Sequence, residues 1–291
     1  MSKSILTITP QLGLIRKVGP RGGKGHWFLN DQQTMGVTTA TSIIEKPALL
    51  GWAAEMGAEF VRTMVGDYVN SGQPVPSGAF EAALSGAKQG YRTVSDKAKA
   101  RGTKVDEWIN AHINARIVAR RTKAAFVGQA LPDAGENPEA VRSINAFLEW
   151  EGSEDVEWLA FQHVAADSAS LIVGVSDWWA IIGKGSGRRA WVGDTKSSKG
   201  NRIFPEWELQ ISANLVLAGL AGTLSTVPFL KANDKEQKWW DNLAEIGRAD
   251  LICDKLTGDY HFGETTTNLR NDWDAVKCAA ALRRRIPQTW N

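Results

Sequence analysis

The feature that most restricts the fold is the stretch from Gly174 to Gln210, which reads GVSDWWAIIGKGSGRRAWVGDTKSSKGNRIFPEWELQ. A first apolar run carries Asp177, a glycine-rich basic turn follows, and a second apolar run ends in Asp194-Thr195-Lys196. Short apolar runs separated by turn residues are typical of neighbouring strands. The pattern therefore predicts an antiparallel strand pair that presents two carboxylates and a lysine.

The chemistry of this pair follows from strand geometry. Side chains alternate along a strand, so Asp194 and Lys196 point to one face and Thr195 to the other. An antiparallel neighbour brings Asp177 within reach of the same ion. Two carboxylates with water and backbone carbonyl ligands suit Mg²⁺. The stretch therefore predicts a metal-dependent site for a phosphodiester, although a lone Asp-x-Lys is usually a surface ion pair.

A helix is predicted after the second strand. Glu206, Gln210 and Asn214 are four residues apart and therefore share one helix face. Gln210 and Asn214 are expected to reach the metal-bound water or a DNA backbone. The alternative is that these side chains form the polar edge of a half-buried helix.

The remaining pattern predicts alternating helices and strands. Helices are expected over 37–70, 79–127 (as two helices, the second from near Thr93), 138–151, 205–220 and 268–285. Strands are expected before residue 36, over 156–166, 170–182 and 189–197, near 224–230, and in a hairpin over 249–264. We expect a basic, DNA-holding N-terminal portion over 1–135 and a core over 136–291, which together form one compact unit.

Charge is segregated along the chain although its net value is only +2. Residues 88–123 contain ten basic and three acidic residues, whereas 133–157 contains eight acidic residues and one arginine. A solvated helix surface is the plain explanation, but a one-signed surface also follows a phosphate backbone. The residues expected to contact DNA are Lys97, Arg101, Lys104, Arg116, Arg120 and Arg121.

The two cysteines, Cys253 and Cys278, are too few for a disulfide framework or a four-thiolate cluster. Two reduced thiols indicate a cytoplasmic protein. No apolar run approaches the roughly 20 residues that span a bilayer, and the N-terminus carries no signal-peptide pattern. We therefore expect a protein without a membrane partner.

These motifs resemble the PD-(D/E)xK nuclease superfamily. The resemblance is to its RecB-like branch, which includes phage-encoded exonucleases and the mitochondrial genome maintenance exonuclease. In that branch a Gly-x-x-Asp strand precedes an Asp-x-Lys strand and a helix with Gln, here Gly174 to Asp177, Asp194 to Lys196, and Gln210. Arg101 to Asp106 is similar to an Arg-Gly-Thr-x-x-His helix whose His binds metal. Residues 37–39, 46–49 and 52 are similar to the N-terminal helices of phage members.

The resemblance implies an α/β (α+β) fold, with a central mixed sheet flanked by helices, a restriction-endonuclease-like core and an N-terminal helical elaboration. It implies Mg²⁺, replaceable by Mn²⁺, held by Asp106, Asp177, Asp194 and the Thr195 carbonyl, without an iron–sulfur cluster. Lys196 would orient the attacking water, and Gln210 would assist.

The implied activity is that of a DNA exonuclease, phage-encoded and acting in recombination, repair or replication in the host cytoplasm. DNA is the implied partner, and a phage single-strand annealing or binding protein is a further candidate.

The chain departs from the family pattern at three places. Asp106 stands where the family has His, and Asn214 stands where a Tyr is usual. The strand before Asp177 often carries a Glu, whereas Phe161-Gln162-His163 offers none. These departures leave two alternatives: a DNA-binding or phage-assembly protein that no longer cleaves, and a structure-selective endonuclease. Polarity, strand preference, the number of metals and the oligomeric state stay open.

Overall fold

The computed structural model describes residues 10–17, 25–43, 47–224 and 237–285, without the side chains of 47–52 and 88–94. The chain divides into two compact units, one formed by 1–44 with 105–291 and the other by 45–104. This division differs from the boundary expected near residue 135. The difference arises because the second half of one long helix packs into the larger unit.

The smaller unit consists of α2 (Pro47–Asn70) and the first half of α3 (Ser77–Thr122). The prediction of two helices over 79–127 is wrong, because α3 is continuous over 46 residues. No proline interrupts it. Gly86 does not break the helix but allows close packing, since a Cβ there would lie 2.3 Å from the Phe60 ring.

Apolar residues recur at three- and four-residue spacing in α2, which predicts one buried face, but this stripe is only partly buried. Ala53, Met56 and Phe60 are half-buried, whereas Met64 is 47% exposed. The other members of this stripe, Ala48, Leu49 and Trp52, lie outside the described side chains.

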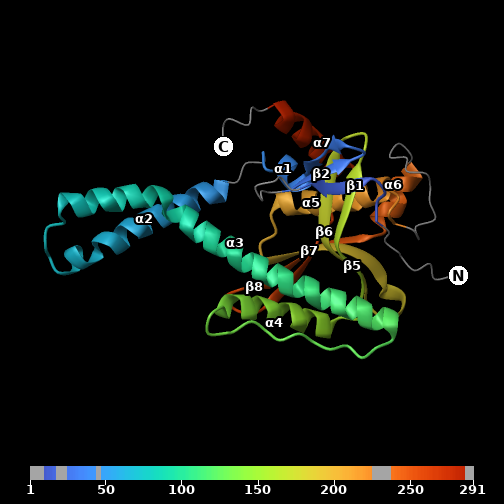
Figure 1. Ribbon diagram of the computed structural model, residues 1–291, viewed down its shortest axis with the longest axis horizontal. Coiled ribbons are helices and arrows are strands. Elements are labelled where there is room, and N and C mark those ends of the chain that lie inside the picture. The colour runs from blue at the N-terminus through green and yellow to red at the C-terminus, as the bar shows by residue number, and fades with distance from the viewer. Residues whose placement is uncertain (1–9, 18–24, 44–46, 225–236, 286–291) are drawn as a thin grey trace. The chain divides into compact units, whose positions relative to one another are not determined.

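The larger unit contains the second half of α3 and the remaining elements (Figure 1). In chain order these are β1 (Leu14–Lys17), β2 (His26–Leu29), β3 (Gln32–Gln33), β4 (Met35–Gly36), α1 (Val37–Thr41), α4 (Pro138–Ser153), β5 (Val156–Asp167), β6 (Ile172–Ile182), the 3₁₀ turn η1 (Gly185–Gly187), β7 (Arg189–Ser198), α5 (Pro205–Leu220), α6 (Gln237–Ala244), β8 (Gly247–Asp254), β9 (Tyr260–Glu264) and α7 (Leu269–Arg285).

A mixed sheet forms the centre of this unit, which confirms the predicted fold class. The described strands follow the order β4-β6-β7-β8-β9, and β5 also pairs with β6. The β4–β6 and β7–β8 pairs are parallel, whereas the other pairs are antiparallel. The predicted strands at 156–166, 170–182 and 189–197 and the hairpin over 249–264 all lie in this sheet.

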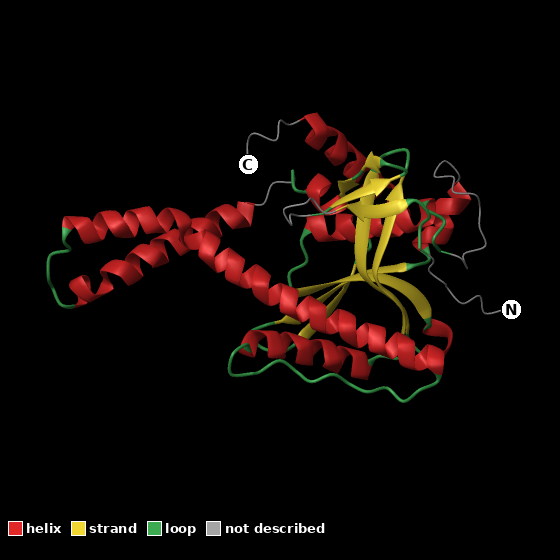
Figure 2. Cartoon of the chain, in the orientation of Figure 1, coloured by secondary structure: helices red, strands yellow, loops and turns green. Residues whose placement is uncertain are grey.

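Helices cover both faces of the sheet, as Figure 2 shows. On one face α1, α5, α6 and α7 enclose a core that includes Trp179, Trp239 and Trp273. On the other face α4 and the second half of α3 enclose a core that includes Trp150 and Trp178. Nine of the thirteen tryptophans are buried in these two cores, as expected from their large apolar area.

Two further expectations concern the ends of the pattern. The strand expected near 224–230 lies outside the described residues except for Leu224, and α6 was not predicted. Within the described chain, no helix combines the length and the apolar character needed to cross a bilayer.

His163 on β5 packs as a neutral side chain. Its Nε2 lies 3.1 Å from Thr223 Oγ1, and that hydroxyl donates to the Ala218 carbonyl. The hydroxyl therefore accepts from the protonated Nε2, and burial lowers the pKa of His163 to about 4.

We expect His163→Gln to reduce the acid sensitivity of folding. The unfolded histidine gains a proton near pH 6.5, but the folded one does so only near 4. The free energy of unfolding of the wild type should therefore fall as the pH drops from 6.5 to 4, by up to about 3 kcal/mol. Urea unfolding at several pH values across this range measures the change in the free energy of unfolding. The exposed-residue control His26→Gln should retain the wild-type slope, and equal slopes for all three proteins would contradict this account.

Candidate active site

The site begins where β6 and β7 separate. Their last paired residues are Trp178 and Gly193. The Trp178 indole lies across Gly193, where an added Cβ would come within 1.9 Å of the ring. Its Nε1 then donates a hydrogen bond to Thr195 Oγ1 at 3.0 Å. This contact fixes β7 against β6 at the point of separation.

Asp177 fills the gap that opens beyond this pair. Its Oδ2 accepts the backbone N–H of Thr195 at 2.9 Å, and its Oδ1 accepts the Gln162 side-chain amide at 3.2 Å. Burial, followed by repulsion and a hydrogen bond from Asp194, raises the pKa of Asp177 well above its ordinary value. Simultaneous ionisation of the two carboxyl groups is therefore unfavourable without a neighbouring positive charge.

Asp194 and Lys196 form an ion pair on one face of β7, and the Thr195 side chain lies on the other. This arrangement confirms the alternation predicted from the sequence. Burial alone would lower the pKa of Lys196, but Asp194, Asp177 and Asp250 outweigh it, and the pKa rises. The neighbouring acids therefore favour the charged form of Lys196.

Asp250 is a residue that the sequence reasoning missed. It lies on β8 directly beside Asp194 in the parallel register and has no exposed surface. Neither of its carboxylate oxygens has a hydrogen-bond partner among the described residues. Burial first, and then Asp194, raises its pKa to about 8. The available signal was an acid inside the apolar run ADLIC.

A cavity of about 630 Å³ opens over Asp177, Asp194 and Lys196. Asp177, Asp194, Lys196 and Gln210 line it, as does Asn214. Gln210 donates its amide to Thr41 Oγ1 at 3.2 Å, and Asn214 donates its amide to the Val175 carbonyl at 3.0 Å. The structure thus brings Asp177, Asp194 and Lys196 of the strands together with Gln210 of α5 around one cavity.

Gln162 and Glu206 differ in their relation to this site. Gln162, in the strand that lacks the family's Glu, contacts Asp177 from a left-handed backbone with φ of 44°. Glu206 is buried and does not line the cavity. The predicted shared face of α5 therefore reaches the cavity only through Gln210 and Asn214.

Asp106, on α3, lies beside the same group of charges. It remains accessible to solvent. Partial loss of hydration, followed by repulsion from Asp194, raises its pKa to about 6, while Lys196 acts in the opposite direction. Asp106 therefore lies within electrostatic reach of Asp194.

The donor set suits a hard cation that keeps much of its water. In the described ranges, no three acidic, histidine or cysteine side chains are close enough to form a complete ligand group. Asp177 and Asp194 nevertheless adjoin, and their mutual repulsion raises the pKa of Asp177. A cation between them would relieve that repulsion, and Mg²⁺ needs only one or two protein carboxylates.

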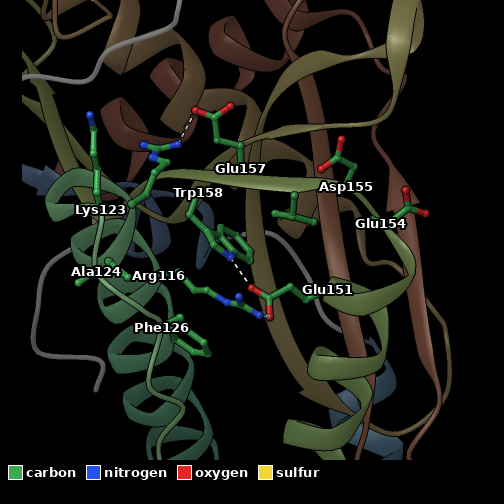
Figure 3. Close-up of a pocket in the computed structure, with 12 residues that line it drawn as sticks. Arg116, Lys123, Ala124, Phe126, Glu151, Glu154, Asp155, Glu157 and Trp158 are labelled. Atoms are coloured by element: carbon green, nitrogen blue, oxygen red, sulfur yellow. Dashed lines mark hydrogen bonds and ion pairs between the residues drawn. The ribbon is translucent and has the colours of Figure 1, made fainter.

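The arginines predicted to hold DNA lie elsewhere. Arg116 and Arg120 line a separate pocket of about 540 Å³ (Figure 3). Arg116 pairs with the buried Glu151 at 3.1 Å, and Arg120 pairs with Glu157. Arg116 follows Asp106 by ten residues, or about 15 Å of helix. These two arginines therefore hold α3 against the core.

The other predicted contacts are surface residues of α3. Lys97 and Lys104 are exposed and Arg101 is half-buried, all within the smaller unit, while Arg121 is exposed in the larger one.

Asp250→Asn should stabilise the protein at neutral and alkaline pH. The unfolded carboxyl ionises near its ordinary value of 3.8, but the folded one ionises only near 8. The wild type therefore loses stability as the pH rises between these values, by up to roughly 6 kcal/mol. Urea unfolding without divalent cations, from pH 4 to 9, measures the difference. The exposed control Asp241→Asn should track the wild type, and an Asp250→Asn difference that does not vary with pH would refute the assignment.

No protein-family model matches the chain, and no curated protein is significantly similar to it in sequence.

Proposed function

We propose that the protein is a Mg²⁺-dependent DNA exonuclease that hydrolyses phosphodiester bonds. The observation that carries this proposal is the meeting of Asp177, Asp194 and Lys196 at the separation of β6 and β7, open to a cavity. Two carboxylates and a permanently charged lysine suit a reaction in which negative charge develops on a phosphate.

Each side chain has a role in this reaction. Asp177 and Asp194 would hold Mg²⁺, which supplies Lewis acidity and a more acidic water when bound. Lys196, whose charged form the neighbouring Asp194 favours, donates hydrogen bonds to the attacking water or a phosphate oxygen. Gln210 lines the cavity wall and orients the substrate there. Asp106 lies close enough to influence Asp194 and would act as a further acid beside the ion.

The wider assignment rests on the family resemblance. We propose a phage-encoded enzyme of recombination, repair or replication. It would act on DNA in the host cytoplasm, together with a single-strand annealing or binding protein. An exonuclease requires an end, so linear single-stranded DNA should be degraded while circular single-stranded DNA survives. Cleavage of the circle would instead favour the structure-selective endonuclease.

One observation favours a second candidate, a DNA-binding or phage-assembly protein that does not cleave. Among the described residues, no three acidic, histidine or cysteine side chains are arranged as a group that could hold a metal ion. Such a protein would retain the cavity and the cations without holding a metal.

Lys196→Met and Asp194→Asn should each lower Mg²⁺-dependent cleavage of end-labelled DNA by at least about 100-fold, as loss of a group that acts in the transition state does. Gel analysis of 5′- and 3′-labelled single- and double-stranded substrates measures the rate. Lys199→Gln, an exposed lysine just beyond β7, is the matched control and should cleave normally. Wild-type rates in the Lys196→Met variant would sink the proposal.

Mg²⁺ or Mn²⁺ should raise the melting temperature of the wild type, because a ligand that binds only the folded state stabilises it. At a concentration 100 times Kd the gain is about 2.7 kcal/mol. Asp177→Asn should lose this response, whereas Asp241→Asn should keep it. A wild type whose melting is unmoved by either cation would support the non-cleaving alternative.

A further inference from the structure

The active-site cavity has a second wall that the proposed chemistry does not use. Arg16 on β1 and Trp27 on β2 line the same cavity as Asp177 and Lys196. These two residues are directly opposed in the antiparallel register of β1 and β2. The Arg16 guanidinium lies over the Trp27 ring, 5.9 Å from its centroid.

The small sheet is fixed to the core near this wall. Gln11 exchanges two hydrogen bonds with the backbone of Ala166, at 2.8 and 2.7 Å. Leu29 is buried against Ala166 and Val173, and Trp27 packs partly on the same cluster. Trp27 therefore has a defined position, with part of its surface left open to the cavity.

The two faces of this small sheet differ. Arg16 is exposed and forms no ion pair with any described residue beyond its contact with Trp27. On the opposite face, Lys17 pairs with Asp31 at 3.2 Å and lies 4.6 Å from the Phe28 ring centroid. Among the described residues of this small sheet, the face toward the cavity presents an aromatic ring together with a cation that has no described ion-pair partner.

We infer that Arg16 and Trp27 form a nucleotide subsite of the cavity, in which Trp27 stacks on an unpaired base and Arg16 contacts an adjoining phosphate. The inference deepens the proposed nuclease function and rests on it for the identity of DNA. An indole face accepts any base, and a guanidinium suits phosphate oxygens. A base must leave its duplex stack to reach an indole, so the substrate class is a single-stranded or frayed DNA end.

The test measures binding in EDTA, where nothing is cleaved. Labelled single-stranded oligonucleotides, each with one abasic position, are titrated with protein by fluorescence anisotropy. The wild type should bind the oligonucleotide whose abasic position falls at Trp27 about 5- to 150-fold more weakly than intact DNA. This factor is equivalent to roughly 1–3 kcal/mol of stacking. Trp27→Leu should bind intact DNA more weakly than the wild type by a similar factor, and its affinity should no longer depend on where the abasic position lies. Trp27→Phe should keep that dependence.

The opposite face of the small sheet supplies matched controls. Phe28→Leu should bind like the wild type. Arg16→Gln should lower the salt dependence, with the slope of log K against log salt falling by about 0.7 for one phosphate contact on a single strand. Lys17→Gln should leave the slope unchanged. Melting curves confirm that each variant is folded.

Three results would overturn the inference. These are wild-type affinity in Trp27→Leu, an abasic penalty that persists in Trp27→Leu, and an equal loss in Phe28→Leu. The nuclease proposal fails separately, on cleavage with Mg²⁺. A protein that cleaves with an abasic penalty independent of Trp27 refutes the subsite alone. A protein that binds through Trp27 but never cleaves refutes the nuclease alone.

Discussion

The hydrogen bond from the Thr195 backbone to Asp177 joins the fold to the site. Beyond Trp178 and Gly193 the two central strands no longer pair, so the Thr195 N–H needs another acceptor. Asp177 provides it at 2.9 Å and is thereby held beside Asp194. The same separation exposes the cavity. The carboxylates therefore lie where the sheet can no longer satisfy its own backbone.

Charge in the site is balanced around a single cation. Lys196 is surrounded by Asp177, Asp194 and Asp250, and its pKa is raised although burial opposes this. Three acids against one base leave the pocket with an excess of negative charge when all are ionised. Burial first, and then repulsion from Asp194, raises the pKa of Asp177 and of Asp250, so protonation of these carboxyl groups would relieve this excess. A bound cation would relieve it in the same way, and this is the physical basis for expecting one.

The sequence predicts the local part of this site and misses the non-local part. Strand alternation was enough to place Asp194 and Lys196 on one face, because it depends on neighbours in the chain. The position of Asp250 beside Asp194 follows from the parallel register of β7 and β8, which no local sequence pattern specifies. For the same reason, the pairing of Arg116 with Glu151 could not be inferred from the basic run on α3. The break expected near Thr93 does not occur, because α3 contains no proline and runs without interruption over 46 residues.

Two glycines of the sheet each lie beneath a tryptophan. A Cβ at Gly193 would meet the Trp178 indole at 1.9 Å, and one at Gly247 would meet Trp191 at 2.2 Å. In each pair the tryptophan ring occupies the space that a side chain at the glycine would need. Evolutionary change at these positions is therefore constrained to occur jointly, since a larger residue under the ring requires a smaller one above it. At Trp178 such an exchange would also remove the indole donor of Thr195, so drift in the core and drift in the site are not independent.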